Sequence, residues 1–384
     1  MATPPARTAL ADTYPNPSNS VFRTGIGAFY DYCKGLLGST GNPAEALDAL
    51  SVGPVQNANL WINSGLSVWQ RGATSVADGA YGFDRVVNLC ETGSLTLSQL
   101  AQPLNGIPYA LRMTQPDASP KRMGCVQIIE AADCLAYRGG NMVFALKVRC
   151  SAATSIRIAL VAWTGTADSP TRDLVNTWSS TNYTASNFFV ANTSTIATVA
   201  TAVSAAAWTD LVVSSASVGG VTAPSGMNNL YLAVWTDTAQ AQNVTLDIAT
   251  PRAGRGTVAP VWTPPNGQSE TQKCLRYFYK FNAPATGSPI GSGLYYGTTT
   301  ASVYHQFAAP MRVNAVVSFG NTGSWVALAS GGTINLGNAS SGAATPYGVE
   351  VNFAAAASGT SGWPIIARFG NASNFIQADA ELGV

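Results

Sequence analysis

Aromatic residues in the last third of the chain are the strongest candidates for binding chemistry. Sugars present C–H faces and hydroxyl groups, so aromatic rings with hydroxyl and amide side chains nearby suit them, and charge is hardly needed. The pattern therefore predicts a glycan-binding site in the C-terminal part of the chain. For each ring, the alternative is packing in the core or between subunits. The candidates, which stand beside Gly, Ser and Thr, are Tyr295, Tyr296, Tyr304, His305, Trp325, Tyr347 and Trp363.

Residues that could support catalysis are sparse. His305 is the only histidine, which excludes multi-histidine metal sites and restricts a nucleophilic triad to that one position. The sequence contains no phosphate-binding glycine loop, zinc-protease motif or hydrolase nucleophile motif. Turn formation is the simpler interpretation of the clustered acids, so we predict no catalysis, no cofactor and no metal. A glycosidase would need two acids facing each other across the scissile bond. The acids that cluster in this sequence form two groups: Asp78, Asp84 and Glu91, then Asp168 and Asp173.

The composition of the 384 residues narrows the possible partners. Charged residues make up 10% of the chain, and 20 Lys and Arg against 19 Asp and Glu leave a formal net charge of +1. A nucleic-acid groove needs a basic face and an anionic membrane attracts polybasic clusters, so neither partner is expected. The chain also has no apolar span of about twenty residues, and its first twenty residues lack the apolar core of a secretory signal. We predict no membrane insertion.

Residues 1–56 are expected to form an N-terminal attachment segment. A proline-rich arm leads to two short helices, predicted at Val21–Leu37 and Ala44–Leu50 by the spacing of their apolar residues. Helices this short are not stable alone in water. They are therefore either a docking or oligomerisation element or a helical cap on the next domain.

Residues 57–262 are expected to form an antiparallel β-sandwich. Apolar or alternating runs such as Asn141–Cys150 and Ser155–Trp163 recur at intervals of about ten residues, with turn-forming residues between them. The similar segments Arg157–Ala167 and Leu230–Gln240 suggest equivalent strands in facing sheets. A parallel sheet would require helices and strands to alternate along the chain, and the sequence shows no such alternation.

Beyond this region we expect a linker helix over 263–283 and a second, jelly-roll-like sandwich over 284–384. Pro264 and Pro265 interrupt the strand pattern, and Ser269–Phe281 follows with Ser269 as a possible helix N-cap. Between Arg312 and Glu350 there is no charged residue. Monomeric β proteins usually protect edge strands with charge or proline, so these edges are expected to be covered by other copies of the chain.

Five segments of the chain resemble tail fibre and receptor-binding proteins of tailed bacteriophages. They are Tyr32–Val52, Asn59–Gly72 (NLWINSGLSVWQRG), 81–85 (YGFDR), Lys273–Lys280 (KCLRYFYK) and Phe375–Leu382 (FIQADAEL). Val86 stands where an aromatic residue often follows in that family. The matching residues of the W-Q-R-G and D-R motifs are Asn59, Ile62, Asn63, Trp69, Gln70, Arg71, Gly72, Asp84 and Arg85.

The resemblance implies a homotrimeric fibre in the virion tail, made in the cytoplasm of the host bacterium. Residues 1–56 would attach it to tail or baseplate proteins, and its C-terminal domain would bind bacterial surface polysaccharide or lipopolysaccharide. No catalytic or ligand residue transfers by position. Trp69, Arg71, Asp84 and Arg85 are expected to hold the sandwich together, with an Arg stacked on Trp and paired with Asp.

Three other functions stay open. The chain could be a structural baseplate or collar fibre protein that does not bind the receptor itself. It could be a tailspike-like polysaccharide depolymerase that uses an acid such as Asp78, Asp84 or Asp379. It could also be a non-viral carbohydrate-binding module.

Overall fold

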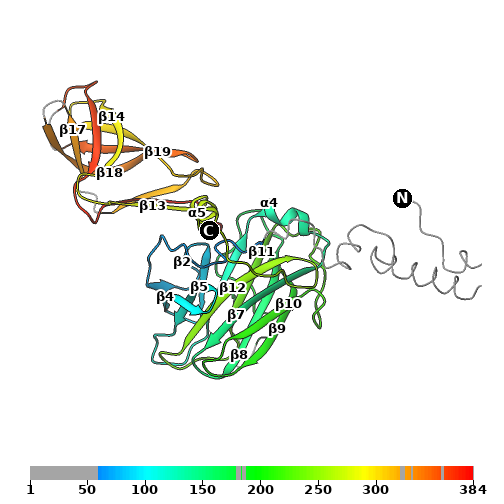
Figure 1. Ribbon diagram of the computed structural model, residues 1–384. Coiled ribbons are helices and arrows are strands. Elements are labelled where there is room, and N and C mark those ends of the chain that lie inside the picture. The colour runs from blue at the N-terminus through cyan, green and yellow to red at the C-terminus, as the bar shows by residue number, and fades with distance from the viewer. Residues whose placement is uncertain are drawn as a thin grey trace, which may run out of the picture.

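The structure, a computed structural model, describes residues 59–383 except 179–182, 184–186, 321–324, 330–331 and 356–358. The attachment segment predicted for 1–56 lies outside the described residues. The described chain is mainly β-strand, and all its strand pairs are antiparallel, so the predicted fold class is confirmed. Two β units lie end to end, joined by a short helix (Figure 1).

The first unit is a sandwich of two six-stranded sheets. In spatial order, the first sheet contains β1 (Ser75–Ala77), β4 (Ser94–Leu104), β5 (Ile107–Thr114), β12 (Thr245–Arg255), β7 (Met142–Cys150) and β10 (Thr209–Ser214). The second contains β2 (Tyr81–Phe83), β3 (Val86–Cys90), β6 (Met123–Ile129), β11 (Asn229–Thr236), β8 (Thr154–Trp163) and β9 (Thr193–Val203). A four-residue helix, α4 (Ala131–Cys134), and a 3-10 turn, η1 (Leu135–Tyr137), follow β6.

The central strands of the second sheet are buried on both faces, which explains their continuous apolar runs. One face meets the first sheet across the main core, where Trp61 stacks on Phe144 at 5.7 Å between ring centroids. The other face is covered by the segment between β8 and β9, whose Phe188 stacks on Trp235 at 5.2 Å. All eight residues of β11 are therefore buried, and a strand buried on both sides needs no polar alternation.

The expectation that Arg157–Ala167 and Leu230–Gln240 lie in facing sheets is wrong. Strands β8 and β11 are neighbours in one sheet and pair antiparallel, with Leu230 opposite Ala162 and Leu232 opposite Leu160. Their sequences are similar because both strands occupy the centre of the same doubly covered sheet.

The linker helix is shorter than expected. Helix α5 spans Gly267–Leu275, and its N-cap is Asn266, whose side-chain oxygen accepts a hydrogen bond from the Ser269 backbone N–H. The chain then turns into strand β13 (Phe278–Asn282). Aromatic residues that also fit a helical face pair here with the C-terminal strand β21 (Phe375–Asp379), because tertiary pairing outweighs a weak local preference.

The C-terminal unit is a closed six-stranded barrel where a second sandwich was predicted. Around the barrel the order is β14 (Pro289–Tyr295), β15 (Thr300–Gln306), β19 (Gly348–Ala355), β18 (Gly332–Thr345), β17 (Trp325–Ala329) and β20 (Pro364–Phe369). The sheet closes because β20 pairs with both β14 and β17. Trp325, Phe353 and Phe369 fill the interior. A three-stranded sheet, β13–β21–β16 with β16 at Val316–Gly320, adjoins the barrel.

Barrel closure removes the open edges of β17 and β18 in the uncharged stretch, while β16 stays an outer strand of the three-stranded sheet. A closed sheet has no edge to offer another copy. In the sandwich, β1 and β2 protect one side because each is only three residues long. On the other side the uncharged β9 accepts a hydrogen bond at the Ile196 carbonyl from Val221 N–H, 2.8 Å away. Association of copies can therefore use sheet faces as well as the outer strands β10, β13 and β16.

Candidate functional site

Three of the seven predicted ligand-binding residues are buried, which corrects the expectation that they contact a glycan. Tyr295 and Trp325 lie in the barrel core. His305 is enclosed as well: its Nδ1 is 2.7 Å from the Ile290 carbonyl, its Nε2 is 3.0 Å from the Tyr279 hydroxyl, and burial lowers its pKa. Successive side chains on a strand point to opposite faces. One member of each dipeptide Tyr295–Tyr296 and Tyr304–His305 therefore faces inward and the other outward.

The other four residues are exposed, and two of them share a groove. Tyr296 and Tyr304 are 53% and 50% exposed, and both line a groove of about 560 Å³ on the outside of the barrel. Tyr347 and Trp363 are also exposed but do not line it. The full lining is Ser292, Gly293, Leu294, Tyr296, Ser302, Val303, Tyr304, Ala343, Thr345 and Glu350. This volume lies in the range of small-molecule sites.

The strand register sets the polar groups of this groove in a row. Tyr304 of β15 lies opposite Ser292 of β14 on one side and opposite Glu350 of β19 on the other. The Ser302 hydroxyl donates a hydrogen bond to Glu350 Oε1 at 2.7 Å. Rings, hydroxyls and one carboxylate thus meet on one face, which is the combination that hydroxyl-rich ligands require.

Two glycines make room for the side chains of this row. A Cβ on Gly348 would lie 2.5 Å from the Tyr304 hydroxyl oxygen and 2.5 Å from the His305 carbonyl oxygen. A Cβ on Gly342 would lie 2.7 Å from Glu350 Oε2. The Tyr304 ring and the Glu350 carboxylate therefore lie directly over backbone, as glycine allows.

Sequence reasoning missed Glu350, Ser292 and Ser302. One signal was available, because Glu350 is the first charged residue after Arg312. The serines carried no signal, since hydroxyl residues are abundant throughout this region. Only the register shows which of them share a face with Tyr304.

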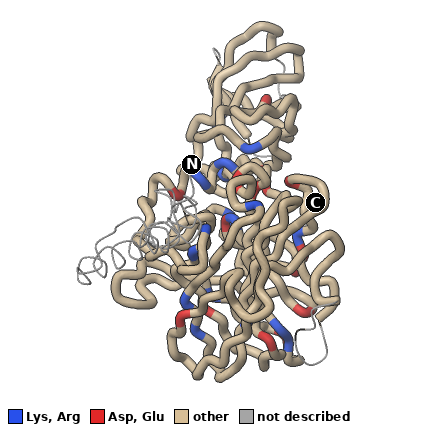
Figure 2. The backbone as a smooth tube through the Cα atoms, turned by 90° about the vertical axis from the view of Figure 1, so that its right-hand side faces the viewer, with Lys and Arg blue, Asp and Glu red and all other residues tan. Residues whose placement is uncertain are grey.

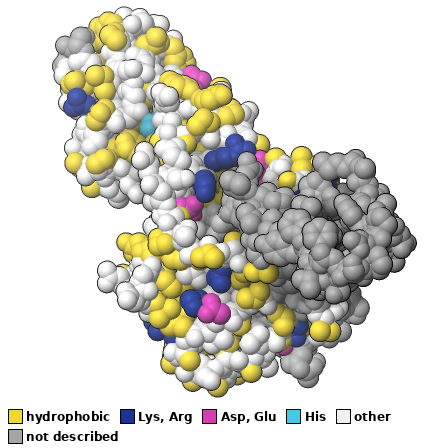
Figure 3. All heavy atoms as spheres, turned by 45° about the vertical axis from the view of Figure 1, so that its right-hand side comes forward, with side chains coloured by type: hydrophobic (Ala, Val, Ile, Leu, Met, Phe, Trp, Pro, Cys, Tyr) yellow, Lys and Arg dark blue, Asp and Glu magenta, His cyan; other side chains and the backbone are white. Residues whose placement is uncertain are grey.

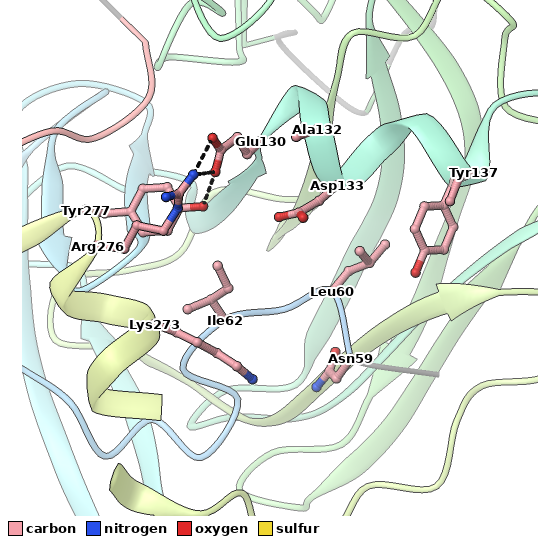
Figure 4. A pocket seen from close by; sticks show the side chains of 11 residues that line it. Asn59, Leu60, Ile62, Glu130, Ala132, Asp133, Tyr137, Lys273, Arg276 and Tyr277 are labelled. Carbon is pink, nitrogen blue, oxygen red and sulfur yellow. Dashed lines mark hydrogen bonds and ion pairs between the residues drawn. The ribbon is translucent and has the colours of Figure 1, made fainter. Parts of the chain in front are cut away.

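A second cavity of about 560 Å³ lies between the sandwich and helix α5 (Figure 4). Most of its polar groups are already paired. Glu130 accepts hydrogen bonds from Arg276 at 2.9 Å and from the Tyr277 hydroxyl at 2.8 Å. Lys273 pairs with Glu270 at 3.0 Å. This cavity belongs to the joint between the two units and is a weaker candidate for ligand binding than the barrel groove.

The W-Q-R-G and D-R residues contact the joint and do not serve the sandwich alone. Arg71 pairs with Asp379 at 3.1 Å and with Glu381 at 3.3 Å, and its guanidinium lies 3.8 Å from the Phe278 ring centroid. Arg85 is fully buried, pairs with Glu381 and stacks on Tyr277 at 3.7 Å. Four of the resembling segments, 59–72, 81–85, 273–280 and 375–382, therefore meet in one buried network.

The remaining motif residues shape the loop that carries these arginines. Trp69 donates its indole N–H to the Gly82 carbonyl and packs on Phe83, so the predicted stacking of Arg on Trp is replaced by arginines on Phe278 and Tyr277. The side-chain amides of Asn59, Asn63 and Gln70 donate hydrogen bonds to the carbonyl oxygens of Pro251, Val68 and Phe278, respectively. The Gln70 backbone N–H donates a hydrogen bond to the Asp84 carboxylate. Gly72 has a positive φ of 61°.

The acids considered for a depolymerase are held in structural contacts. Asp84 is buried and accepts a hydrogen bond from the Gln70 backbone N–H at 2.8 Å. Asp379 pairs with Arg71, and Asp78 accepts a hydrogen bond from the Cys90 N–H at 2.8 Å. Among the described residues no group of three or more His, Cys, Asp or Glu is placed to hold a metal ion. In the same residues, no helix is long and apolar enough to span a bilayer.

Burial of Asp84 predicts a pH dependence of stability. Desolvation raises the pKa of Asp84 from 3.8 to about 6. At pH values between 3.8 and 6, Asp84 is largely protonated in the folded protein and largely ionised in the unfolded chain. The free energy of unfolding therefore rises as the pH falls from 7.5 to 5. We expect Asp84 to contribute about 1–1.5 kcal/mol to this rise, measured by urea unfolding at several pH values.

Asp84→Asn removes the titrating group and keeps a hydrogen-bond acceptor for Gln70. Its stability should increase less than that of the wild type over the same pH interval. Asp210→Asn, at an exposed position on β10, is the control and should follow the wild type. Equal pH profiles for Asp84→Asn and the wild type would contradict the assignment.

No protein-family model and no curated protein matches the chain. Similar solved structures include a putative sugar binding protein from Bacteroides thetaiotaomicron, at 12% identity and a TM-score of 0.31, covering 51% of this chain and 99% of that one. A family 22 carbohydrate binding module of Clostridium thermocellum Xyn10B, at 12% identity and a TM-score of 0.30, covers 53% and 99%. TmCBM61, solved with beta-1,4-galactotriose, has 10% identity, a TM-score of 0.30 and coverage of 51% and 98%. At such low identities and TM-scores these similarities define neither a family nor a ligand for this chain.

Proposed function

We propose that this chain is a bacteriophage tail fibre protein, attached to the tail through residues 1–56, that binds host surface glycans through its C-terminal barrel. The observation that carries glycan binding is the groove in which Tyr296 and Tyr304 lie beside Glu350 and several hydroxyl groups. The fibre assignment is supported by the sequence resemblance. In three-dimensional space four of its segments form a single contact network between the two units.

Apolar side chains on the outside of the barrel support association of copies in a homotrimer. Ile366 of β20 and Leu328 of β17 are opposite each other and are 39% and 37% exposed. Figure 3 shows hydrophobic side chains over the visible barrel surface, and Figure 2 shows few charged residues there. Such a face loses little solvation energy when another copy covers it. Several weak sugar sites in one fibre would then act together by avidity.

Deletion of Met1–Val52 tests the attachment and the trimer together. We expect the truncated chain to stay soluble and trimeric, because the described residues after Val52 form large apolar cores in both the sandwich and the barrel. It should bind host cells as an isolated protein but fail to join tails. Native mass spectrometry and assembly on fibreless particles measure these outcomes. Incorporation of the truncated chain would contradict the attachment role, and a stable monomer at working dilution would contradict the trimer.

A further inference from the structure

We propose that the barrel groove selects neutral, hydroxyl-rich sugars and rejects sugars that carry carboxylate or phosphate groups. This inference rests on the proposed glycan binding and adds the charge class of the ligand. Among the described residues that line the groove, Glu350 is the only acidic or basic side chain. An anionic ligand would therefore meet a carboxylate with no cation in the lining to balance it.

The carboxylate of Glu350 is held ready to accept sugar hydroxyls. Its Oε1 already accepts the Ser302 hydroxyl at 2.7 Å. Its Oε2 lies over Gly342, and no hydrogen bond to this oxygen is found among the described residues. A carboxylate oxygen accepts strongly from hydroxyl donors, whereas it repels a uronic-acid or phosphate oxygen. Tyr304, directly opposite on β15, supplies the ring on which a sugar C–H face can rest.

The surrounding barrel offers little positive charge to offset this repulsion. Across the six barrel strands the only charged residues are Glu350 and Arg368. Arg368 lies on β20 opposite Pro289 and Val326, and it is not part of the groove lining. The half-exposed position of the groove leaves the repulsion sensitive to salt, because mobile ions screen charges near the surface.

The test compares matched ligands on the full-length protein. Neutral oligosaccharides ending in a hexose are paired with the same oligosaccharides oxidised at C6 of that hexose to the uronic acid. We expect the neutral member to bind at least about tenfold more tightly at low salt, and the ratio to shrink at high salt. Glu350→Gln should bring the ratio close to one by improving binding of the acidic member.

Asp210→Asn removes the same charge from an exposed sandwich strand and should keep the wild-type ratio. If neither member of any pair binds, or if binding does not depend on the groove, the proposed function itself fails. If the sugars bind at the groove but the acidic member binds equally or better, or Glu350→Gln leaves the ratio unchanged, the charge selection is wrong and glycan binding stands.

Discussion

Replacing Arg85 by Met is expected to lower the free energy of unfolding by about 3–5 kcal/mol. Arg85 has no exposed surface, and its guanidinium contacts the Glu381 carboxylate, the Ile128 carbonyl oxygen and the face of Tyr277. Met keeps most of the side-chain volume but leaves Glu381 buried without its partner. The backbone φ of 69° at this position strains both residues equally, so the comparison isolates the lost charge.

A double-mutant cycle with Glu381→Gln measures the pairing itself. If the two groups act together, the double variant should be more stable than the sum of the single losses predicts. Lys147→Met removes one member of the exposed pair with Asp210 and is expected to cost at most about 1 kcal/mol. Losses of equal size for Arg85→Met and Lys147→Met would contradict a buried joint. Urea unfolding, followed by fluorescence, gives all four values.

Tyr304→Ala is expected to weaken glycan binding about thirtyfold, equivalent to about 2 kcal/mol. Tyr304 is the residue on which the groove centres: it lies between Ser292 and Glu350 in the strand register. Its ring is also half-exposed, so its removal takes away the apolar platform without opening a cavity in the barrel core. Thermal unfolding of the variant should therefore stay close to that of the wild type. Binding of isolated protein to host cells and purified surface polysaccharide measures the loss.

Tyr347→Ala provides the matched control, because this tyrosine is 64% exposed on the barrel and does not line the groove. It should bind like the wild type. Trp325→Ala separates stability from recognition, since Trp325 packs inside the barrel against Phe353 and Phe369; truncating it should cost about 3–5 kcal/mol. Unchanged binding by Tyr304→Ala, or equal losses from Tyr304→Ala and Tyr347→Ala, would exclude the groove as the glycan site.

The sequence alone predicted the antiparallel β class and most strands, because apolar periodicity and turn residues are local signals. Segments such as Asn141–Cys150 and Ser155–Trp163 differ from the observed strands β7 and β8 by one residue at their starts. The barrel could not be predicted in this way. Closure depends on the pairing of β20 with both β14 and β17, and that pairing leaves no trace in the local pattern.

The candidate site was predicted only in part for the same reason. Amino-acid composition identified aromatic residues in a poorly charged region, but it could not tell Tyr304 from its neighbour His305. The pleat sends Tyr304 outward to the groove and His305 inward to Ile290 and Tyr279. Likewise, the arginines of the W-Q-R-G and D-R motifs were recognised as structural, while their partners lie about three hundred positions away.

Residue type and spacing by themselves determined which segments become strands and that little charge is available for recognition. The tertiary structure alone decided that the last unit is closed, which aromatic rings reach solvent, and that Glu350 faces Tyr304. The physical reason is that local preference is written in neighbouring residues, whereas register, closure and burial arise from hydrogen bonds and contacts between residues distant in the chain.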